Sequence, residues 1–365
     1  MLPISPGIAM KRKNDPNERI SIMKYITFTV PCYNSEDYLE RCVESLLPGG
    51  EDVEIILIDD GSTDRTPGII DTYAEKYPGI VRAVHKENGG HGSGVNAGLN
   101  LAAGVYFKVV DSDDWLDAAA YRTILRTIRK HVSFTTGRPL PDLYITNYVY
   151  NHLDEGKAHR QSFSNLFPEE KLCSWEDMGH IFPSQCMIMH ALVYRTELLR
   201  MCGVRLPEHT FYVDNILAFE PLPYAKHLYY VNIDLYQYYI GRADQSINES
   251  VLIGRLDQYV RVIDHILDHT DLAKLKEDQP KLAKYLYNFL ALMVGTVSSH
   301  YTIAGTPEAA LDREQFWDNM REKSPKQYHC LRRTLVGKAT HPKTKAGNKF
   351  MLAAFRLVRK YYKFQ

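Results

Sequence analysis

Short apolar runs alternate with segments of helical length in YITFTVPCYNSEDYLE (residues 25–40), VEIILIDDGSTDRTPGIIDTYAEKYP (53–78) and VRAVHKENGGHGSGVNAGLNLAAGVYFKVVDSDDWLD (81–117). The apolar runs are rich in β-branched and aromatic residues and span Ile26–Val30, Val53–Ile58, Val81–Val84 and Tyr106–Val110. Parallel neighbouring strands need long connections, so strands that alternate with helices predict a mainly parallel sheet flanked by crossover helices. The sequence therefore predicts an α/β fold.

A polar cluster follows each predicted strand, namely Pro31–Asn34, Asp59–Asp64, Gly89–Gly94 and Asp111–Asp114. Open α/β sheets bind ligands in the crevice outside the carboxyl ends of their strands. The four clusters therefore predict one site. Because proline lacks a backbone donor, we expect the first strand to stop at Pro31.

Composition excludes several classes of protein. The chain has 365 residues, 45% of them hydrophobic and 24% charged, with a formal net charge of zero. These values are typical of globular proteins and give no sign of nucleic-acid binding. The six cysteines are scattered without a C-x-x-C pair, so neither a disulfide framework nor a zinc site is indicated and a reducing cytoplasm fits.

The two ends of the chain differ from its middle. Residues 1–24 are polar, lack the apolar run of a secretory signal, and are predicted to form a flexible leader. Residues 250–365 have apolar residues at helical spacing, as in Leu252–Leu267 and Lys281–Ser299, and predict a helical C-terminal extension. The apolar stretch Leu286–Val297 is too short for a bilayer and predicts a buried helix.

The last residues of the chain are basic and amphipathic. From Arg321 to Gln365, Lys and Arg far outnumber the single acid, Glu322. In 349–363 one helical face is apolar and another carries Lys349, Arg356 and Lys360, a pattern typical of helices in a membrane interface. A helix docked on its own protein explains the pattern equally well.

Two of the strand-end clusters have an ordinary structural explanation beside a functional one. Tyr33 could stack on a flat ring, or be a half-buried rim aromatic. Asp60 could accept a hydrogen bond from a base N–H, while the cluster Asp59–Asp64 also suits helix capping.

The glycine segment Gly89–Gly94 precedes a helix expected at Val95–Ala103. Backbone N–H groups at such a helix N-terminus suit a phosphate, and His91 could donate to a diphosphate. A loop histidine is equally an ordinary surface residue. The segment matches neither the dinucleotide fingerprint nor a P-loop.

The turn Asp111-Ser112-Asp113-Asp114 directly follows a strand. Carboxylates at i and i+2 aim the same way, and hard oxygen ligands of this kind suit Mg²⁺ or Mn²⁺ shared with a diphosphate. The alternative is a solvated acidic turn that caps the helix near Asp117. Together with the other three clusters, the turn favours metal–diphosphate binding.

The order TVPCYN, IDDGSTD, NGG…N-x-G and VDSDDWL resembles glycosyltransferase family 2, whose catalytic domains have the GT-A fold. The likeness is strong over 25–129 and looser over 194–248. It implies a Rossmann-like GT-A domain at 25–249 and a nucleotide-sugar donor, commonly UDP-linked. Asp60 would lie at the base, Asp111 near the ribose, and Asp113, with Asp111, at a Mn²⁺ or Mg²⁺ ion.

The resemblance also assigns the remaining candidate residues. Asp214 in FYVDN matches the aspartate that deprotonates the acceptor hydroxyl, although it could simply cap the next helix. LYQYYIGRADQSIN (235–248) resembles a segment that closes over the diphosphate or acceptor. Many members have Arg before Asn96; here Val95 stands there, which makes His91 a substitute phosphate contact. The implied donor-binding set is Pro31, Tyr33, Asp60, Gly90, His91, Asn96, Asp111, Ser112, Asp113, Arg242, Gln245 and Ser246.

The sequence thus predicts a metal-dependent inverting glycosyltransferase of the hexosyltransferase type. Its expected partners are a nucleotide-sugar donor and a saccharide or lipid-linked saccharide acceptor of cell-envelope biosynthesis. We expect a cytoplasmic protein, with peripheral contact to the inner face of the membrane through the basic tail. A sugar nucleotidyltransferase is an alternative, although no basic, glycine-rich segment accompanies the first strand. A nucleotide-sugar-binding protein without turnover is another, which the intact Asp111, Asp113 and Asp214 disfavour.

Overall fold

The structure is a computed structural model and describes residues 23–134, 137–182, 185–241, 245, 248–342, 344, 346–349 and 351–353. Within this part of the chain ten strands form one sheet, in the order β3-β2-β1-β4-β9-β6-β10-β5, with β7 paired to β6 and β8 to β10. The strands are β1 (Ile26–Cys32), β2 (Val53–Asp59), β3 (Val81–His85), β4 (Tyr106–Val109), β5 (Trp115–Leu116), β6 (Leu143–His152), β7 (Lys157–Gln161), β8 (Leu172–Cys173), β9 (Leu192–Arg195) and β10 (Leu228–Ile240).

The four strands predicted between residues 26 and 110 form the parallel half of the sheet. Strand β1 pairs in parallel with β2 and β4, and β2 with β3. In the other half, β9 pairs antiparallel with both β4 and β6. All seven residues of β1 are buried, as expected for a strand covered on both faces.

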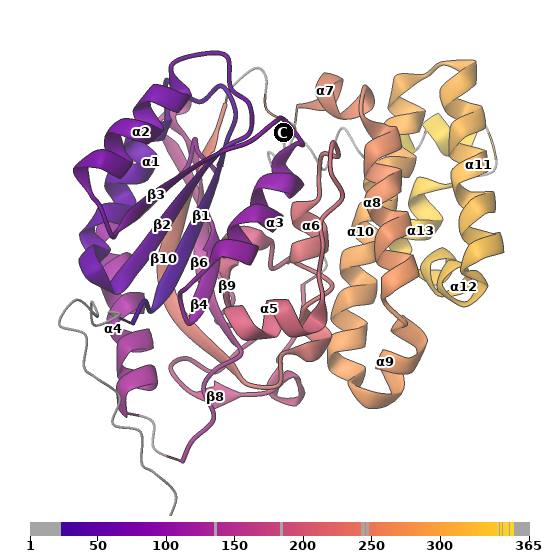
Figure 1. Cartoon of the computed structure of the whole chain (residues 1–365). Coiled ribbons are helices and arrows are strands. Elements are labelled where there is room, and N and C mark those ends of the chain that lie inside the picture. The colour runs from indigo at the N-terminus through magenta and orange to yellow at the C-terminus, as the bar shows by residue number, and fades with distance from the viewer. Residues whose placement is uncertain are drawn as a thin grey trace, which may run out of the picture.

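Helices cover both faces of the sheet. Figure 1 shows α1, α2 and α4 on one side and α3, α5 and α6 on the other. These helices are α1 (Leu39–Leu46), α2 (Thr66–Lys76), α3 (His91–Leu101), α4 (Ala118–Phe134), α5 (Thr196–Cys202) and α6 (Asp214–Leu217). Successive side chains of β1 serve the two faces in turn: Phe28 meets Tyr121 of α4 edge-on, with ring centroids 5.5 Å apart, and Thr29 lies against Gly98 of α3.

The first strand runs past Pro31, contrary to expectation. Thr29 O accepts a hydrogen bond from Val110 N, on the side of β4, while Cys32 O accepts one from Asp60 N, on the side of β2. Residues alternate between the two neighbours, so the missing N–H of Pro31 falls on the β4 side. Pairing with β4 has already ended at Thr29, and the ladder with β2 continues undisturbed to Cys32.

Helix α3 begins at His91, earlier than the predicted Val95. The glycines at the start of α3 are poor helix formers, which is why a later start was expected. Two glycines of α3 are needed for close packing: a Cβ on Gly98 would lie 2.2 Å from Thr29 Oγ1, and one on Gly94 would lie 3.0 Å from Pro31 Cβ. Gly90, with φ at 83°, makes the turn into the helix.

The region after residue 142 supplies strands β6 to β10. The polar stretch 151–160 is a hairpin between β6 and β7, and Cys186–Arg200 contains β9 followed by α5. Short 3-10 turns lie at Leu47–Asp52, Leu153–Glu155, Trp175–Asp177, Met189–Ala191 and Leu222–Tyr224.

The described chain is helical from Glu249 onward, as predicted. Its helices are α7 (Glu249–Ile253), α8 (Leu256–His269), α9 (Leu272–Asp278), α10 (Pro280–Ala304), α11 (Pro307–Lys323), α12 (Pro325–Arg333) and α13 (Leu335–Thr340). Most of the helix predicted at Leu252–Leu267 is α8, and a break at Gly254 separates α7 from it.

The long helix α10 joins this region to the sheet. It contains the apolar stretch Leu286–Val297, which is largely buried as predicted. Tyr285 OH accepts a hydrogen bond from Met187 N at 2.7 Å, and Phe289 packs against Phe219 with ring centroids 5.8 Å apart. Among the described residues, no helix combines the length and apolarity needed to cross a membrane. Most of the basic stretch 349–363 lies outside the described residues.

Candidate active site

The acidic turn Asp111–Asp114, which follows β4, contacts the first turn of α3. His91 Nε2, in the first turn of α3, lies 2.9 Å from Asp111 Oδ1. Burial alone would lower the pKa of His91, but the hydrogen bond and charge of Asp111, with the charges of Asp214 and Asp60, raise it. Asp111 is correspondingly stabilised as a carboxylate: burial opposes ionisation, yet His91 lowers the pKa of Asp111. Residues from four separate segments thus share one electrostatic environment.

Two tyrosines of strand β10 hold the acidic turn through hydrogen bonds. Tyr236 OH donates to Asp114 Oδ2 at 2.6 Å and accepts from Asp111 N at 3.0 Å. The other oxygen of Asp114 accepts from Tyr239 N at 2.7 Å. Burial, with the charges of Asp113 and Asp111, raises the pKa of Asp114 well above its usual range. Asp114 and Tyr236 therefore position the turn, a role that the sequence did not reveal.

The two middle residues of the turn are fixed from α1 and the loop before it. Ser112 is buried, and its Oγ lies 2.7 Å from Ser35 Oγ. Arg41 Nη2 donates to Asp113 O at 2.6 Å and its guanidinium stacks over Trp115. The backbone of Asp113 is therefore held in place.

The residues around Asp111 fit a divalent cation. Asp111, Asp114 and His190 offer ligand atoms that all lie within 4.8 Å of one another. Burial lowers the pKa of His190 to about 4, so this imidazole is neutral and can act as a ligand. Its Nδ1 is buried and finds no hydrogen-bond partner among the described residues. The Asp111 carboxylate and a neutral imidazole suit Mn²⁺, whereas both oxygens of Asp114 are already bonded to Tyr236 and Tyr239. His190 was not predicted, because it lies far from the acidic turn in sequence.

Asp60 fastens the glycine segment. Its Oδ1 accepts from Lys86 Nζ at 2.6 Å and Gly89 N at 3.0 Å, and its Oδ2 accepts from Gly90 N at 2.7 Å. The carboxylate thus shapes the loop in front of α3. The ion pair with Lys86 was not foreseen, since Lys86 belongs to no motif of the sequence.

Asn96 links α3 to the segment that leads to Asp214. Its Nδ2 donates to Leu206 O at 2.8 Å and its Oδ1 accepts from Leu206 N at 3.0 Å. His209 N donates to Gly89 O at 2.6 Å nearby. The side-chain amide of Asn96 is therefore engaged with the protein, and its predicted contact with a donor stays a prediction.

Asp214 stands at the start of the short helix α6 and is half-buried. Burial, with the charge of Asp111, raises the pKa of Asp214 to about 6, although His91 acts in the opposite direction. Tyr212, two residues earlier, has the left-handed φ of 65°, which costs a non-glycine residue energy and is frequent at functional sites. A carboxyl with a pKa close to neutrality suits a general base.

Of the remaining predicted residues, Pro31, Tyr33 and Gln245 are among the described residues. Tyr33 is 54% exposed, and Pro31 lies against Gly94 of α3. Gln245 is buried and donates to Tyr239 O at 2.6 Å. Arg242 and Ser246 lie outside the described residues.

The sequence is similar to known glycosyltransferases. Residues 27–194 match the model of Glycosyl transferase family 2. EpsH of Bacillus subtilis (strain 168), named a glycosyltransferase, is 28% identical over 267 residues, which is 71% of either chain. The minor teichoic acid biosynthesis protein GgaB of the same organism is 28% identical over 160 residues, 43% of this chain and 17% of GgaB.

A solved structure has the same fold over nearly the whole chain. S. aureus TarS 1–349 in complex with UDP superimposes with a TM-score of 0.63 at 17% identity, over 91% of each chain. Its complex with UDP-GlcNAc gives a TM-score of 0.51 at 18% identity, over 85% of this chain and 90% of that one. The predicted fold class, with its helical C-terminal part, is confirmed.

Proposed function

We propose that this chain is a glycosyltransferase of family 2 that moves a sugar from a UDP-linked donor to a hydroxyl acceptor with inversion; the match of residues 27–194 to the model of that family supports this. The observation that carries the proposal is the convergence of Asp111, His91 and Asp214 outside the strand ends. Inverting transfer needs a base on the acceptor side and compensation of charge on the leaving diphosphate. Asp214 can serve as the base, and His91 with the N-terminus of α3 can bind the diphosphate.

We propose a metal-dependent reaction, which the residues around the acidic turn support. Asp111 and Asp113 would hold Mn²⁺ or Mg²⁺, whose charge offsets the charge that develops on the departing diphosphate. Asp114 and His190 lie beside Asp111 and complete the polar surroundings. The carboxyl group of Asp114 is already hydrogen-bonded to Tyr236 and Tyr239, so its main role is to orient the turn.

The donor type rests on the structural relative. TarS binds UDP and UDP-GlcNAc in its crystal structures, and the shared fold supports a uridine nucleotide here. Pro31, Tyr33, Asp60, Gly90, Asn96, Ser112, Arg242, Gln245 and Ser246 remain the proposed contacts around that donor.

The acceptor is proposed to be a saccharide or lipid-linked saccharide of the cell envelope. GgaB, whose name refers to teichoic acid biosynthesis, supports this class of acceptor. We propose a cytoplasmic enzyme whose basic residues 349–363 contact the inner face of the membrane. Pelleting with anionic vesicles tests the contact: deleting 349–365 should abolish binding, and equal binding by both chains would contradict it.

The donor and metal are tested together by thermal shift. UDP-, GDP- and TDP-sugars are screened with and without Mn²⁺ on the wild type and on Asp113→Asn. A UDP-sugar should raise the melting temperature in the presence of metal and lose this effect in the variant, because a ligand stabilises the state that it binds. Stabilisation by a UDP-sugar that is independent of metal and of Asp113 would contradict metal dependence.

The chemistry is tested on the base. Asp214→Asn should lower kcat by about 10²- to 10⁴-fold, the usual contribution of a general base, while the donor still binds. Asp278→Asn, an exposed carboxyl at the end of α9, is the matched control and should leave kcat unchanged. Full turnover by Asp214→Asn would refute the assignment, and pyrophosphate release from UTP and sugar phosphate would identify a nucleotidyltransferase instead.

A further inference from the structure

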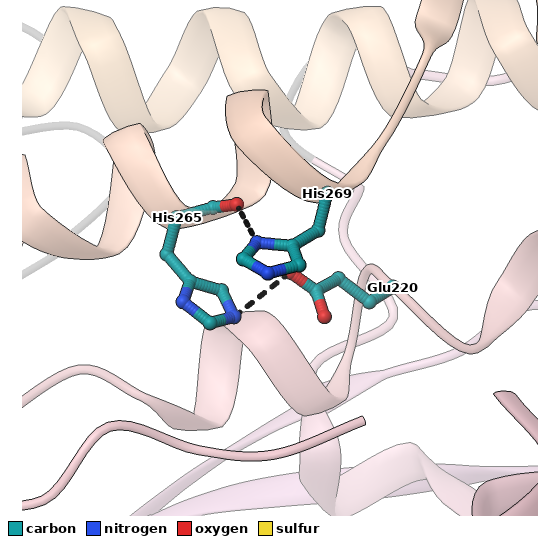
Figure 2. Close-up of side chains that lie close together, drawn as sticks. All are labelled: Glu220, His265 and His269. Carbon is teal, nitrogen blue, oxygen red and sulfur yellow. Dashed lines mark hydrogen bonds and ion pairs between the residues drawn. The ribbon is translucent and has the colours of Figure 1, made fainter. Parts of the chain in front are cut away.

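A second group of metal-ligating side chains lies away from the crevice, where the sheet domain meets the helical region. His265 and His269 stand four residues apart on α8 and therefore share one face of that helix. Glu220 comes from the segment just after α6, where its N–H donates to Ile216 O. Figure 2 shows the two imidazoles and the carboxylate turned toward one another across this junction.

The three side chains have the geometry of a site. Their ligand atoms all lie within 4.8 Å of one another. His265 Nε2 is 3.2 Å from Glu220 Oε1, and the two imidazole rings stack with centroids 4.1 Å apart. His269 Nδ1 lies 2.8 Å from His265 O, so this nitrogen donates and Nε2 is left as the lone-pair nitrogen. In metal-bound histidines, a hydrogen bond donated by the ring nitrogen that does not bind the metal fixes the tautomer.

The carboxylate of Glu220 gives independent support for a cation at this position. Glu220 Oε1 is buried, yet it makes no hydrogen bond in the described part of the chain. Its contact with His265 is an ion pair only when that imidazole is protonated. A buried carboxylate oxygen without a donor costs free energy, and a cation at this position removes the cost.

We propose that Glu220, His265 and His269 bind one divalent cation of the Zn²⁺ class, with solvent in the fourth position. Two imidazole nitrogens and one carboxylate form a ligand set typical of Zn²⁺, whereas Mg²⁺ and Ca²⁺ prefer oxygen ligands. His269 is exposed, which leaves a path for the ion and for water. The site is separate from the metal proposed at Asp111 and Asp113, and it does not depend on the proposed function.

The cation fastens α8 to the segment that carries Asp214. Glu220 lies six residues after Asp214, on the same short stretch of chain. The first half of α8 already holds the loop before Asp214: Gln258 Oε1 accepts from Phe211 N at 2.9 Å, and Arg261 Nη1 donates to Thr210 Oγ1 at 3.2 Å. A metal at the other end of α8 therefore completes the clamp on this loop and stabilises the junction.

Zinc binding to the full chain tests the proposal. Chelator-treated protein is titrated with ZnCl₂, and bound metal and melting temperature are measured. We expect one equivalent of Zn²⁺ that raises the melting temperature, and binding at least about tenfold weaker in His269→Ala and Glu220→Gln. Because His269 is exposed, its replacement removes little packing besides its stacking on His265, and far-ultraviolet circular dichroism checks the fold of both variants.

Two further variants separate this site from other sources of binding. His329→Ala removes an exposed helical histidine on α12 and should bind Zn²⁺ like the wild type. Asp113→Asn should also keep this equivalent, because its carboxylate belongs to the other metal. The proposal is overturned if the wild type binds no Zn²⁺, or if His269→Ala and Glu220→Gln bind it as tightly as His329→Ala does.

Discussion

His91 Nε2 lies 2.9 Å from Asp111 Oδ1, and this contact connects the first turn of α3 with the acidic turn after β4. The two residues are far apart in the sequence, but the parallel pairing of β1 with β4 brings the end of β4 beside α3. The contact brings an imidazole and a carboxylate together at the place where a nucleotide diphosphate is proposed to bind.

Replacing His91 by Gln should weaken donor binding. A hydrogen bond to a charged group contributes about 1.5–3 kcal/mol, so the KM for the donor should rise about 10- to 100-fold. Steady-state kinetics with varied donor measure the effect. His85→Gln is the control, since His85 also pairs with carboxylates, those of Asp59 and Asp71, but lies on β3. An unchanged KM in a folded His91→Gln protein would show that His91 does not contact the donor.

Activity should depend on the ionisation of Asp214. Its pKa is raised to about 6, and a general base works only when deprotonated. The value of kcat/KM, which reports on the free enzyme, should be constant above this pH and fall about tenfold per pH unit below it. The measurement is a pH profile at saturating metal, with the fold checked at each pH. An acid limb displaced to about pH 4 would mean that another group limits the rate.

Tyr236→Phe should loosen the acidic turn. The substitution removes the hydroxyl that bonds Asp114 Oδ2 and Asp111 N, both inside the protein. Leaving buried partners unsatisfied costs about 1–3 kcal/mol, which denaturant unfolding would detect. Tyr224→Phe, at an exposed tyrosine, should change stability little. Equal stability of the two variants would contradict the role assigned to Tyr236.

Lys86→Met should disturb the glycine segment through Asp60. The ammonium group lies 2.6 Å from Asp60 Oδ1, and the same oxygen accepts from Gly89 N. Losing the partner of a nearly buried carboxylate should cost about 1–3 kcal/mol of stability and raise the KM for the donor. Lys76→Met, at the exposed end of α2, is the control. If both variants unfold and bind alike, the ion pair has no part in shaping the loop.

Two glycine-to-alanine substitutions should have opposite effects. At Gly98 the added Cβ would lie 2.2 Å from Thr29 Oγ1, so the overpacked interface should lose about 1–3 kcal/mol. At Gly68 of α2 no atom of the described part of the chain lies within 4 Å of the added Cβ, and the better helix former should gain up to about 1 kcal/mol. Urea unfolding of both variants measures the difference. A Gly98→Ala variant as stable as the wild type would show that α3 does not need this close approach.

Local patterns in the sequence determined much of this protein. The alternation of β-rich runs with helical segments predicted four parallel strands, because hydrophobic periodicity records which face of each element is buried. The position of Asp60, Asp111 and Asp214 at strand or helix ends followed from the same reading, together with the family resemblance. The helical C-terminal part was also predicted from periodicity.

The tertiary structure alone decided which distant residues meet. Lys86, His190 and Tyr236 belong to no motif, and their partners are set by the order of strands in the sheet, which periodicity does not encode. Tertiary packing likewise overrode helix propensity at the start of α3. The cluster of Glu220, His265 and His269 exists only because α8 docks beside the end of α6, a contact between elements that no local pattern specifies.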